Sequence, residues 1–315
     1  MPQRDAATLE SLAFVVPVYN ERETLEPLAE GIARHAAPHP FHVLFVDDGS
    51  TDGSSDVLIE MHKRHPWVDV VRFRRNFGKT AALAVGFQLA QGDIVFTMDA
   101  DLQDDPKEIP RFVEALRAGF DMVCGWKRIR HDPWHKTISS RIYNRWVSRV
   151  FRLPLHDVNC GFKAMRADVA RHLVLYGEMH RLIPVLAQQN GCRIPEIPVE
   201  HHSRRSGISK YGIERFMRGA ADVITVRFLE GFGASPGHSF YPLGGFFELT
   251  GGLLMLGSII ALAVGPVDEA LLLILLSMSV QMALAGLFLF GLGFVAERSV
   301  RMRPPITSAT IVASE

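Results

Sequence analysis

The chain has 315 residues, enough for one large domain with an appendage or for two domains. Its formal net charge of +0 gives no general attraction for polyanions, so no nucleic-acid partner is expected. Three widely spaced cysteines form no C-x-x-C pair, which argues against a zinc site or a disulfide framework and is typical of a reducing compartment: Cys124, Cys160 and Cys192.

Apolar runs alternate with helical patterns through the first part of the chain. Strands are predicted at 13–18, 41–46, 68–73, 94–98 and 121–124, with helices ending near residue 36 and spanning 54–65, 79–91 and 106–118. This alternation predicts an α/β domain with a mostly parallel sheet and helices on both faces. Right-handed crossovers would bring the acidic and glycine-rich turns that follow these strands to one edge of the sheet.

Two carboxylates, Asp99 and Asp101, follow the apolar run 94–98. In open α/β sheets ligands bind beyond the carboxyl ends of the strands. An Asp-x-Asp pair there predicts a hard-oxygen site for Mg²⁺ or Mn²⁺, which commonly share their ligands with substrate phosphates. The residues alone also allow a simple loop or helix cap, because aspartate is common at both. Nearby, Gly78-Lys79-Thr80 is not a phosphate loop, since the upstream glycine position is occupied by Phe73.

The stretch from about residue 125 to 211 is predicted to be irregular and basic. Scattered cations usually form a solvated face, but here they precede apolar segments, where a phosphorylated substrate at a bilayer would need them. Asp157 lies in a loop-like context within this stretch. The cations are Lys127, Arg128, Arg130, Lys136, Arg141, Arg145, Arg149, Arg204, Arg205 and Lys210.

Two uncharged stretches, 249–267 and 270–296, are each long enough to span a hydrocarbon core. The loop between them carries only acidic charges, whereas arginines flank the pair on both sides, so the positive-inside rule predicts that both flanks are cytoplasmic. A pair of buried core helices is the alternative. Helical spacing at 213–228 predicts an amphipathic helix at the membrane interface or an ordinary docking helix.

These patterns predict four parts. They are an α/β domain at 1–212, an interfacial helix and linker at 213–235, a transmembrane hairpin at 236–297 with helices at about 243–265 and 270–295, and a tail at 298–315. We expect a multi-pass protein of the inner or plasma membrane with both termini in the cytoplasm.

Six motifs in order, followed by the hairpin, resemble family 2 glycosyltransferases of GT-A fold. The resemblance is to the polyprenyl-phosphate branch, which includes dolichyl-phosphate mannose synthases and bacterial undecaprenyl-phosphate glucosyl- and aminoarabinosyltransferases, and it covers nearly the whole chain. The motifs are Pro17-Val18-Tyr19-Asn20-Glu21, Val46-Asp47-Asp48-Gly49-Ser50-Thr51-Asp52-Gly53, Arg75-Asn76-Phe77-Gly78-Lys79, Asp99-Ala100-Asp101-Leu102-Gln103, Asp157 with Cys160-Gly161-Phe162-Lys163, and Arg204 with Gly207, Ser209 and Lys210.

The resemblance implies a role for each matching position. Asp99 and Asp101 would hold the metal, with Asp48 facing the base and Asp157 near the sugar. The nucleotide sugar would be held by Pro17, Tyr19, Glu21, Val46, Asp48, Asp99, Ala100, Asp101 and Gln103, and the acceptor phosphate by Arg141, Arg204, Ser209 and Lys210.

One departure from the family pattern concerns the catalytic set. The family often has Gly-Ser-Arg where this chain has Gly125-Trp126-Lys127. Lys127 keeps the charge but loses the bidentate fork of arginine, which Arg128 would supply instead. The candidates for catalysis are therefore Asp101, Lys127, Arg128 and Asp157.

The implied reaction moves a sugar from a UDP- or GDP-sugar to undecaprenyl or dolichyl phosphate with inversion. A lipid phosphate is already anionic, so it needs positioning and charge neutralisation more than a general base. A processive polysaccharide synthase is one alternative, although its Q-x-x-R-W motif has Ile142 in the glutamine position. A non-catalytic, membrane-anchored nucleotide-sugar binder is another. The resemblance also implies that the chain can self-associate.

Overall fold

The computed structural model describes residues 10–129, 134–202, 219, 221–228, 237–301 and 311–313. The chain forms two compact units, one of residues 1–225 with 308–315 and the other of residues 226–307. The predicted boundaries at 212 and 235, and the whole stretch 203–218, lie outside the described residues.

The first unit opens with strands and helices in alternation, close to the predicted ranges. These are β1 (Leu12–Val18), α1 (Leu25–Ala36), β2 (Phe41–Asp47), α2 (Ser54–Arg64), β3 (Val68–Phe73), α3 (Lys79–Leu89), β4 (Ile94–Thr97), the 3-10 helix η1 (Pro106–Glu108), α4 (Ile109–Arg117) and β5 (Met122–Trp126).

The prediction of an irregular middle is wrong. Residues 134–202 form α5 (Trp134–Phe151), β6 (Lys163–Arg166), α6 (Ala167–His172), the 3-10 helix η2 (Met179–Leu182), α7 (Ile183–Gln189) and β7 (Glu196–Pro198). The long helix α5 was not predicted because its apolar residues lie on both its buried and its exposed faces and so give no amphipathic pattern. Tyr143 and Val147 are buried, whereas Ile138 and Ile142 are 47% and 60% exposed.

The strands form one mixed sheet in the order β7-β5-β6-β4-β1-β2-β3-β8. Neighbours among β1 to β4 are parallel, as are β5 and β7, whereas β6 runs antiparallel to both β4 and β5. The short strand β8 (Ile311–Ala313) adds antiparallel to β3. Most strands therefore end at one edge of the sheet, and β6 begins there, which confirms the mostly parallel sheet.

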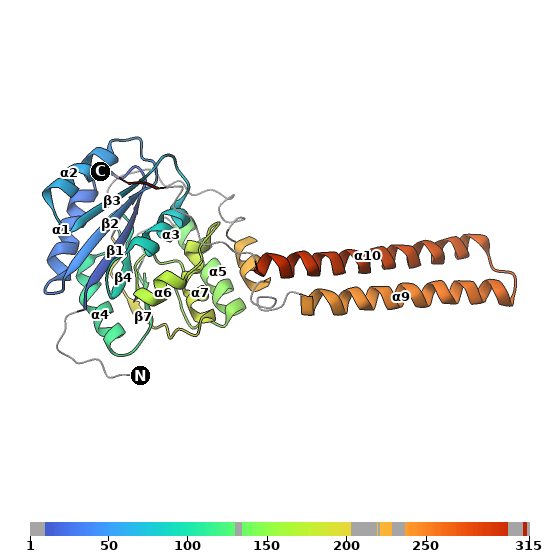
Figure 1. Cartoon of the computed structure of the whole chain (residues 1–315). Coiled ribbons are helices and arrows are strands. Elements are labelled where there is room, and N and C mark those ends of the chain that lie inside the picture. Colours follow the sequence, from blue (N-terminus) through green and yellow to red (C-terminus); the bar gives the residue numbers. More distant parts are fainter. Residues whose placement is uncertain are drawn as a thin grey trace. The chain divides into compact units, whose positions relative to one another are not determined.

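Helices cover both faces of the sheet (Figure 1). Helices α1, α2 and α4 pack together on one face, and α3 packs with α6 and η2 on the other. Aromatic rings fill the first face: Phe14 and Phe96 stack at 4.8 Å between centroids, and Phe112 and Phe162 stack at 4.5 Å. All four are buried, so they fix β4, whose end carries Asp99.

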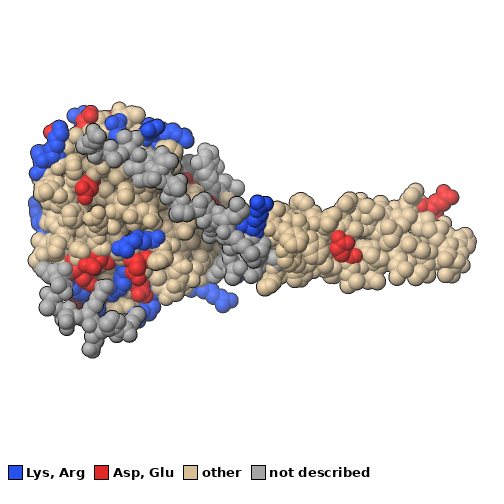
Figure 2. Space-filling model, in the orientation of Figure 1, with Lys and Arg blue, Asp and Glu red and all other residues tan. Residues whose placement is uncertain are grey.

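The second unit holds two long helices, α9 (Gly237–Val264) and α10 (Glu269–Arg301). Both are long and apolar enough to cross a membrane, with mean hydropathies of 1.9 and 2.2. Large apolar side chains point outward, including Leu249 at 65% and Leu287 at 64% exposure. Figure 2 shows this nearly uncharged surface. The two apolar helices are confirmed, while their orientation in a membrane stays a prediction.

Residues 221–228 are helical and lie within the predicted amphipathic segment. Val223 is buried, and the Asp222 carboxylate accepts a hydrogen bond from the backbone N–H of Glu178 at 2.7 Å. Ile224 and Phe228 of the predicted apolar stripe are 64% and 45% exposed. Asp222 and Val223 are thus held within the first unit, whereas the two described residues of the predicted apolar face, Ile224 and Phe228, are largely exposed.

Candidate active site

The turns that follow β1 and β2 are tied together at the carboxyl edge of the sheet. The backbone N–H of Asn20 donates to Ser50 Oγ at 3.0 Å, and that of Glu21 donates to Ser54 Oγ at 3.1 Å. The N–H of Thr51 donates in return to Asn20 Oδ1 at 2.8 Å. These bonds hold the predicted donor-binding turn after β1 in one conformation.

Four of the residues predicted to hold the nucleotide sugar lie at this edge in different surroundings. Pro17, Tyr19 and Glu21 are partly exposed, so a ligand can reach them. The side chain of Val46 is fully buried. Only the backbone of Val46 is therefore available to a ligand.

Asp48, predicted to face the base, braces the turn before α3. Its carboxylate is buried and accepts the backbone N–H groups of Phe77 at 2.6 Å and Gly78 at 2.8 Å. Burial raises the pKa of Asp48, although these two hydrogen bonds oppose the shift. Each carboxylate oxygen thus has a protein partner, and the predicted contact with a base remains a prediction.

Asp99 lies on the sheet face covered by α3, because side chains alternate along a strand and its extension. Lys79 Nζ, at the start of α3, is 2.5 Å from Asp99 Oδ1. Burial would raise the pKa of Asp99, but the ammonium groups of Lys79, Lys127 and Lys163 lower it to about 2. Asp99 is therefore ionised throughout the physiological range.

Gly161 makes room for this carboxylate. A Cβ atom at position 161 would lie 2.7 Å from Asp99 Oδ2, closer than real Cβ contacts come. The Gly161 carbonyl also accepts the hydroxyl of Thr97 at 2.7 Å, which holds the two segments together. An alanine at this position would therefore force the Asp99 carboxylate to move.

Two further lysines are buried near Asp99. Lys127 Nζ lies 2.8 Å from Asp104 Oδ1, and the Asp104 side chain is fully buried. Burial would lower the pKa of Lys127, but Asp104 outweighs it and the pKa is raised. Lys163, 2% exposed, donates to the Cys160 carbonyl. The predicted cation at position 127 is therefore paired with a carboxylate that the sequence did not single out.

The segment after β7 meets the Asp-x-Asp loop. The backbone N–H of His202 donates to the Gln103 carbonyl at 2.9 Å, and Gln103 Nε2 reaches the His202 carbonyl at 3.4 Å. The N–H of Gln103 donates to Asp101 Oδ1 at 3.2 Å, which shapes the loop. Asp104 forms a β-bridge with His201. This contact follows from the topology, because β7 ends at the same edge as β4.

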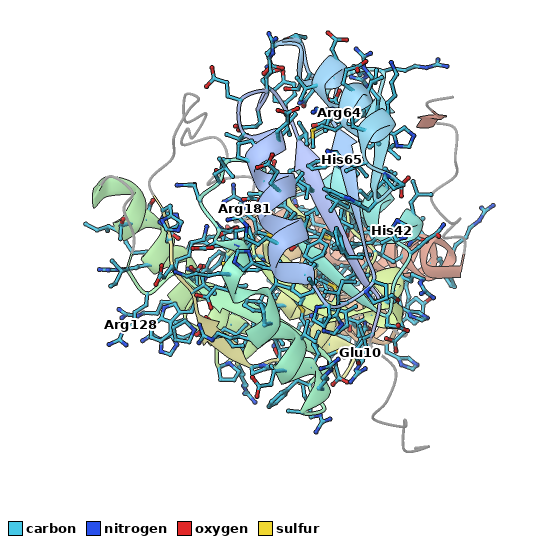
Figure 3. The ribbon with its side chains drawn as sticks, turned by 90° about the vertical axis from the view of Figure 1, so that its left-hand side faces the viewer. Glu10, His42, Arg64, His65, Arg128 and Arg181 are labelled. Atoms are coloured by element: carbon cyan, nitrogen blue, oxygen red, sulfur yellow. The ribbon has the colours of Figure 1, made fainter. Side chains whose placement is uncertain are left out.

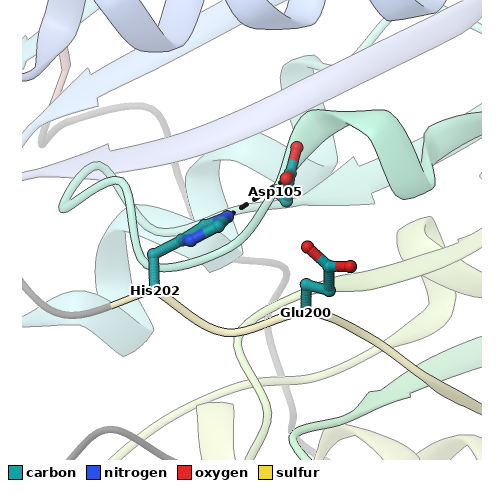
Figure 4. Close-up of side chains that lie close together, drawn as sticks. All are labelled: Asp105, Glu200 and His202. Carbon is teal, nitrogen blue, oxygen red and sulfur yellow. Dashed lines mark hydrogen bonds and ion pairs between the residues drawn. The ribbon is translucent and has the colours of Figure 1, made fainter.

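Asp105, Glu200 and His202 place one potential metal-ligating atom each within 4.8 Å of one another (Figure 4). His202 Nε2 lies 3.1 Å from Asp105 Oδ2. Lys107 Nζ already contacts both carboxylates, at 3.4 Å from Asp105 Oδ2 and in a short contact with Glu200. The ammonium thus supplies a positive charge to this exposed cluster.

A small pocket opens beside Asp99, lined in part by Lys79, Asn159, Lys163 and His180. His180 Nδ1 lies 2.7 Å from the hydroxyl oxygen of Thr80. Burial lowers the pKa of His180 well below its ordinary value, and the charges of Lys79 and Arg181 act in the same direction. The imidazole is therefore neutral and can hydrogen-bond to a ligand hydroxyl.

Asp157 is buried against α5, where Asn144 Nδ2 donates to its Oδ1 at 2.9 Å. Its backbone N–H donates to Glu196 Oε1 at 2.7 Å, so the turn is firmly held. Arg128 is exposed and lies at the outside of the domain in Figure 3. Arg141 is also exposed. The other predicted acceptor-phosphate residues lie outside the described residues: Arg204, Ser209 and Lys210.

Asp99 and Asp101 are the side chains that would hold a divalent metal at this edge. Asp99 is ionised at the sheet edge, and Asp101, partly exposed, follows it on the same turn. Carboxylate oxygens are the ligands that Mg²⁺ and Mn²⁺ prefer. When bound, such a cation would offset the negative charge of a diphosphate.

Sequence reasoning missed Asp104, His180 and the Asp105–Glu200–His202 cluster, and it dismissed the Gly78-Lys79-Thr80 run, although Lys79 contacts Asp99. That run begins α3 and forms no phosphate loop, so the dismissal of that motif was correct. The adjacent histidines 201 and 202, next to the predicted cation Arg204, were the available signal.

The fold is an α/β domain with charged side chains gathered at the carboxyl edge of its sheet, and sequence comparison gives its family. The model of glycosyl transferase family 2 matches residues 13–174, and the chain belongs to this family.

Curated relatives refine this placement. Dodecaprenyl-phosphate galacturonate synthase of Rhizobium johnstonii is 40% identical over 74% of this chain and 71% of the relative. Undecaprenyl-phosphate 4-deoxy-4-formamido-L-arabinose transferase of Edwardsiella ictaluri is 36% identical over 70% and 69%. Its Salmonella choleraesuis counterpart is 31% identical over 95% and 93%.

Solved structures support the fold. A mannosyltransferase from Pyrobaculum calidifontis in complex with GDP-Man and Mn²⁺ has a TM-score of 0.51 at 18% identity, covering 95% of this chain and 77% of that one. Glucosyl-3-phosphoglycerate synthase from Mycobacterium tuberculosis, with Mn²⁺, UDP and phosphoglyceric acid, has a TM-score of 0.54 at 20% identity over 70% and 78%. The implied GT-A fold is thereby confirmed.

Proposed function

We propose that this chain transfers a sugar from a nucleotide diphosphate sugar to a polyprenyl phosphate at a membrane, with a divalent metal on Asp99 and Asp101. Family membership and the relatives, whose names specify dodecaprenyl or undecaprenyl phosphate, support the reaction class. The observation that carries the proposal is the Asp99 carboxylate at the sheet edge with Lys79 Nζ 2.5 Å away, in a chain with two membrane-length apolar helices.

Different residues at the edge have different roles in this proposal. Asp48 and the tied turns after β1 and β2 shape the nucleoside side, and the lysines near Asp99 face the charge that develops on the diphosphate leaving group. The acceptor phosphate oxygen is already anionic, so orientation matters more than proton removal. Direct attack by this oxygen inverts the anomeric centre.

Asp157 is better suited to positioning than to proton transfer. It is 1% exposed and held by Asn144, so it fixes the turn that leads to Gly161 and β6. We propose that Lys127 and Arg128 both contribute positive charge to the site. Lys127 does so from its buried pair with Asp104, and Arg128 from the exposed surface of the domain.

A donor panel tests the function. The full-length protein, purified in detergent with Mg²⁺ or Mn²⁺ and a polyprenyl phosphate, is given UDP- and GDP-sugars, and lipid-linked product is measured. We expect one donor class to react and Asp101→Asn to lose at least about 100-fold in turnover, the scale of a lost electrostatic contact to the transition state. Asp56→Asn, an exposed aspartate of α2, is the matched control and should retain turnover.

No product with any donor would contradict the enzymatic proposal. Product formation that is unchanged by Asp101→Asn and by chelation would contradict the metal site. Retention of the anomeric configuration in the product would contradict direct displacement.

A further inference from the structure

Lys79 is the first residue of α3, and the preceding turn fixes its position. Gly78 has φ = 95°, in the left-handed region that favours glycine. Phe77 and Gly78 both donate their backbone N–H groups to Asp48. The buried Asp48 carboxylate therefore determines where α3 begins and from which point the Lys79 side chain extends.

The Lys79 ammonium contacts the carboxylate that is the first proposed metal ligand. Nζ lies 2.5 Å from Asp99 Oδ1, and the side chains are 34% and 30% exposed. A divalent cation on the same oxygen would lie within a few ångströms of the ammonium, and like charges at such distances repel strongly away from bulk water. Lys79 and a metal therefore compete for Asp99.

Lysine is suited to leaving this position again. Its charge is compact and its four-carbon stem is flexible, whereas the planar arginine fork holds a fixed bidentate geometry. The side chain is also a third exposed, so it has room to move. By contrast, Lys127 is 11% exposed and paired with the fully buried Asp104, so it is held in place.

We propose that Lys79 is an exchangeable counter-ion of Asp99, which neutralises the carboxylate before the metal arrives and then moves to the diphosphate of the donor. The inference rests on the proposed function, because it takes Asp99 as a metal ligand. Lys79 weakens binding of the metal alone and strengthens binding of the metal together with the nucleotide. The site thereby favours the complete metal–donor pair.

Direct measurement of Mn²⁺ binding tests this exchange. The full-length protein in detergent is titrated with Mn²⁺, and free Mn²⁺ is followed by its electron paramagnetic resonance signal, without nucleotide and with UDP or GDP. We expect Lys79→Met to bind Mn²⁺ alone about tenfold tighter than the wild type, which corresponds to ~1.4 kcal/mol of removed competition. The gain in Mn²⁺ affinity on adding nucleotide should be smaller in Lys79→Met than in the wild type.

Two variants serve as controls. Lys79→Arg keeps the charge and should keep weak binding of Mn²⁺ alone. Lys63→Met removes an exposed lysine of α2 that pairs with Glu60 at 2.9 Å, and should behave as the wild type.

The possible outcomes distinguish a failure of the Lys79 exchange from a failure of the proposed metal site. If Asp99→Asn and Asp101→Asn abolish Mn²⁺ binding but Lys79→Met binds Mn²⁺ alone no tighter than the wild type, the exchange is wrong and the metal site stands. If Mn²⁺ binding is insensitive to both aspartate variants, the metal site fails, and the inference fails with it.

Discussion

Large apolar side chains are buried in the first unit and exposed in the hairpin of the second. In the first unit large rings such as Phe14 and Phe96 are fully buried, whereas in the α9–α10 hairpin Leu253 and Leu287 are 61% and 64% exposed. Large apolar side chains thus face protein in the first unit and the surroundings in the hairpin. The contrast indicates that each unit is folded for a different solvent.

Polar groups also find their partners differently. In the hairpin, the hydroxyls of Ser258 and Ser279 return to carbonyls of their own helix at 2.8 Å. At the sheet edge, by contrast, Lys79 and Lys127 reach carboxylates on other segments of the chain. The ion pairs at the edge therefore form only when the chain folds, whereas these two serine–carbonyl hydrogen bonds are local to each helix, although Ser279 Oγ also lies 3.7 Å from Met255 Sδ on α9.

The strongest test of this contrast removes the buried cation Lys127. Lys127→Met leaves Asp104 buried and uncompensated, so we expect a loss of about 3–5 kcal/mol in stability. Thermal unfolding followed by circular dichroism measures it. Lys107→Met, which opens an exposed ion pair with Asp105 and Glu200, should leave the melting temperature nearly unchanged. Equal shifts for both variants would show that burial is not what distinguishes the two lysines.

The second test places a charge on the hairpin. Leu253→Arg on α9 should cost about 2.5–3.5 kcal/mol of membrane insertion if the helix spans a bilayer. Carbonate extraction of membranes measures the fraction that remains integrated. Ile59→Arg, an exposed apolar residue of α2 in the first unit, is the matched control and should remain membrane-bound. Full integration of Leu253→Arg would contradict the assignment of α9 as a span.

The third test compares glycines in the two units. Gly161→Ala puts a Cβ atom against Asp99, so we expect a fall in turnover of about 100-fold, equivalent to ~2.7 kcal/mol, with a folded protein. Gly257→Ala in α9 has no neighbour within 4 Å of its new Cβ and should keep turnover. Rates of lipid-linked product formation measure both. Unchanged turnover in Gly161→Ala would show that the position of Asp99 is not critical.

The smallest expected effect is the pH dependence of stability from His180. The folded protein keeps this imidazole neutral well below the ordinary pKa of 6.5, whereas the unfolded chain takes up a proton near that pH. The unfolded state then binds more protons, so stability falls as pH drops below 6.5, by up to ~1.4 kcal/mol per pH unit.

Melting temperatures between pH 7.5 and 5.5 measure this dependence. His180→Gln should flatten the profile, and His172→Gln, an exposed histidine of α6, should follow the wild type. A profile for His180→Gln as steep as that of the wild type would assign the pH dependence to other groups.

The first half of the sheet could be predicted from the sequence because its signals are local. Runs such as 94–98 are apolar and end in acidic turns, so both β4 and the place of Asp99 follow from the residues. The second half could not be predicted in this way. Strand β6 begins with a lysine, Lys163, and α5 has apolar residues on both faces.

The contacts within the site could not be predicted from the sequence because they join segments that are far apart along the chain. The pairing of Lys79 with Asp99 joins α3 to β4, and that of Lys127 with Asp104 joins β5 to the loop after β4. Neither follows from spacing along the chain. The meeting of His202 with Gln103 likewise depends on β7 pairing parallel to β5.

The hydrogen bond from Glu178 to Asp222 joins two segments that lie far apart along the chain. Asp222 lies between the sheet and α9 along the chain, and Glu178 immediately precedes η2, which carries His180. The hydrogen bond therefore ties the segment that leads towards α9 to the turn that precedes His180.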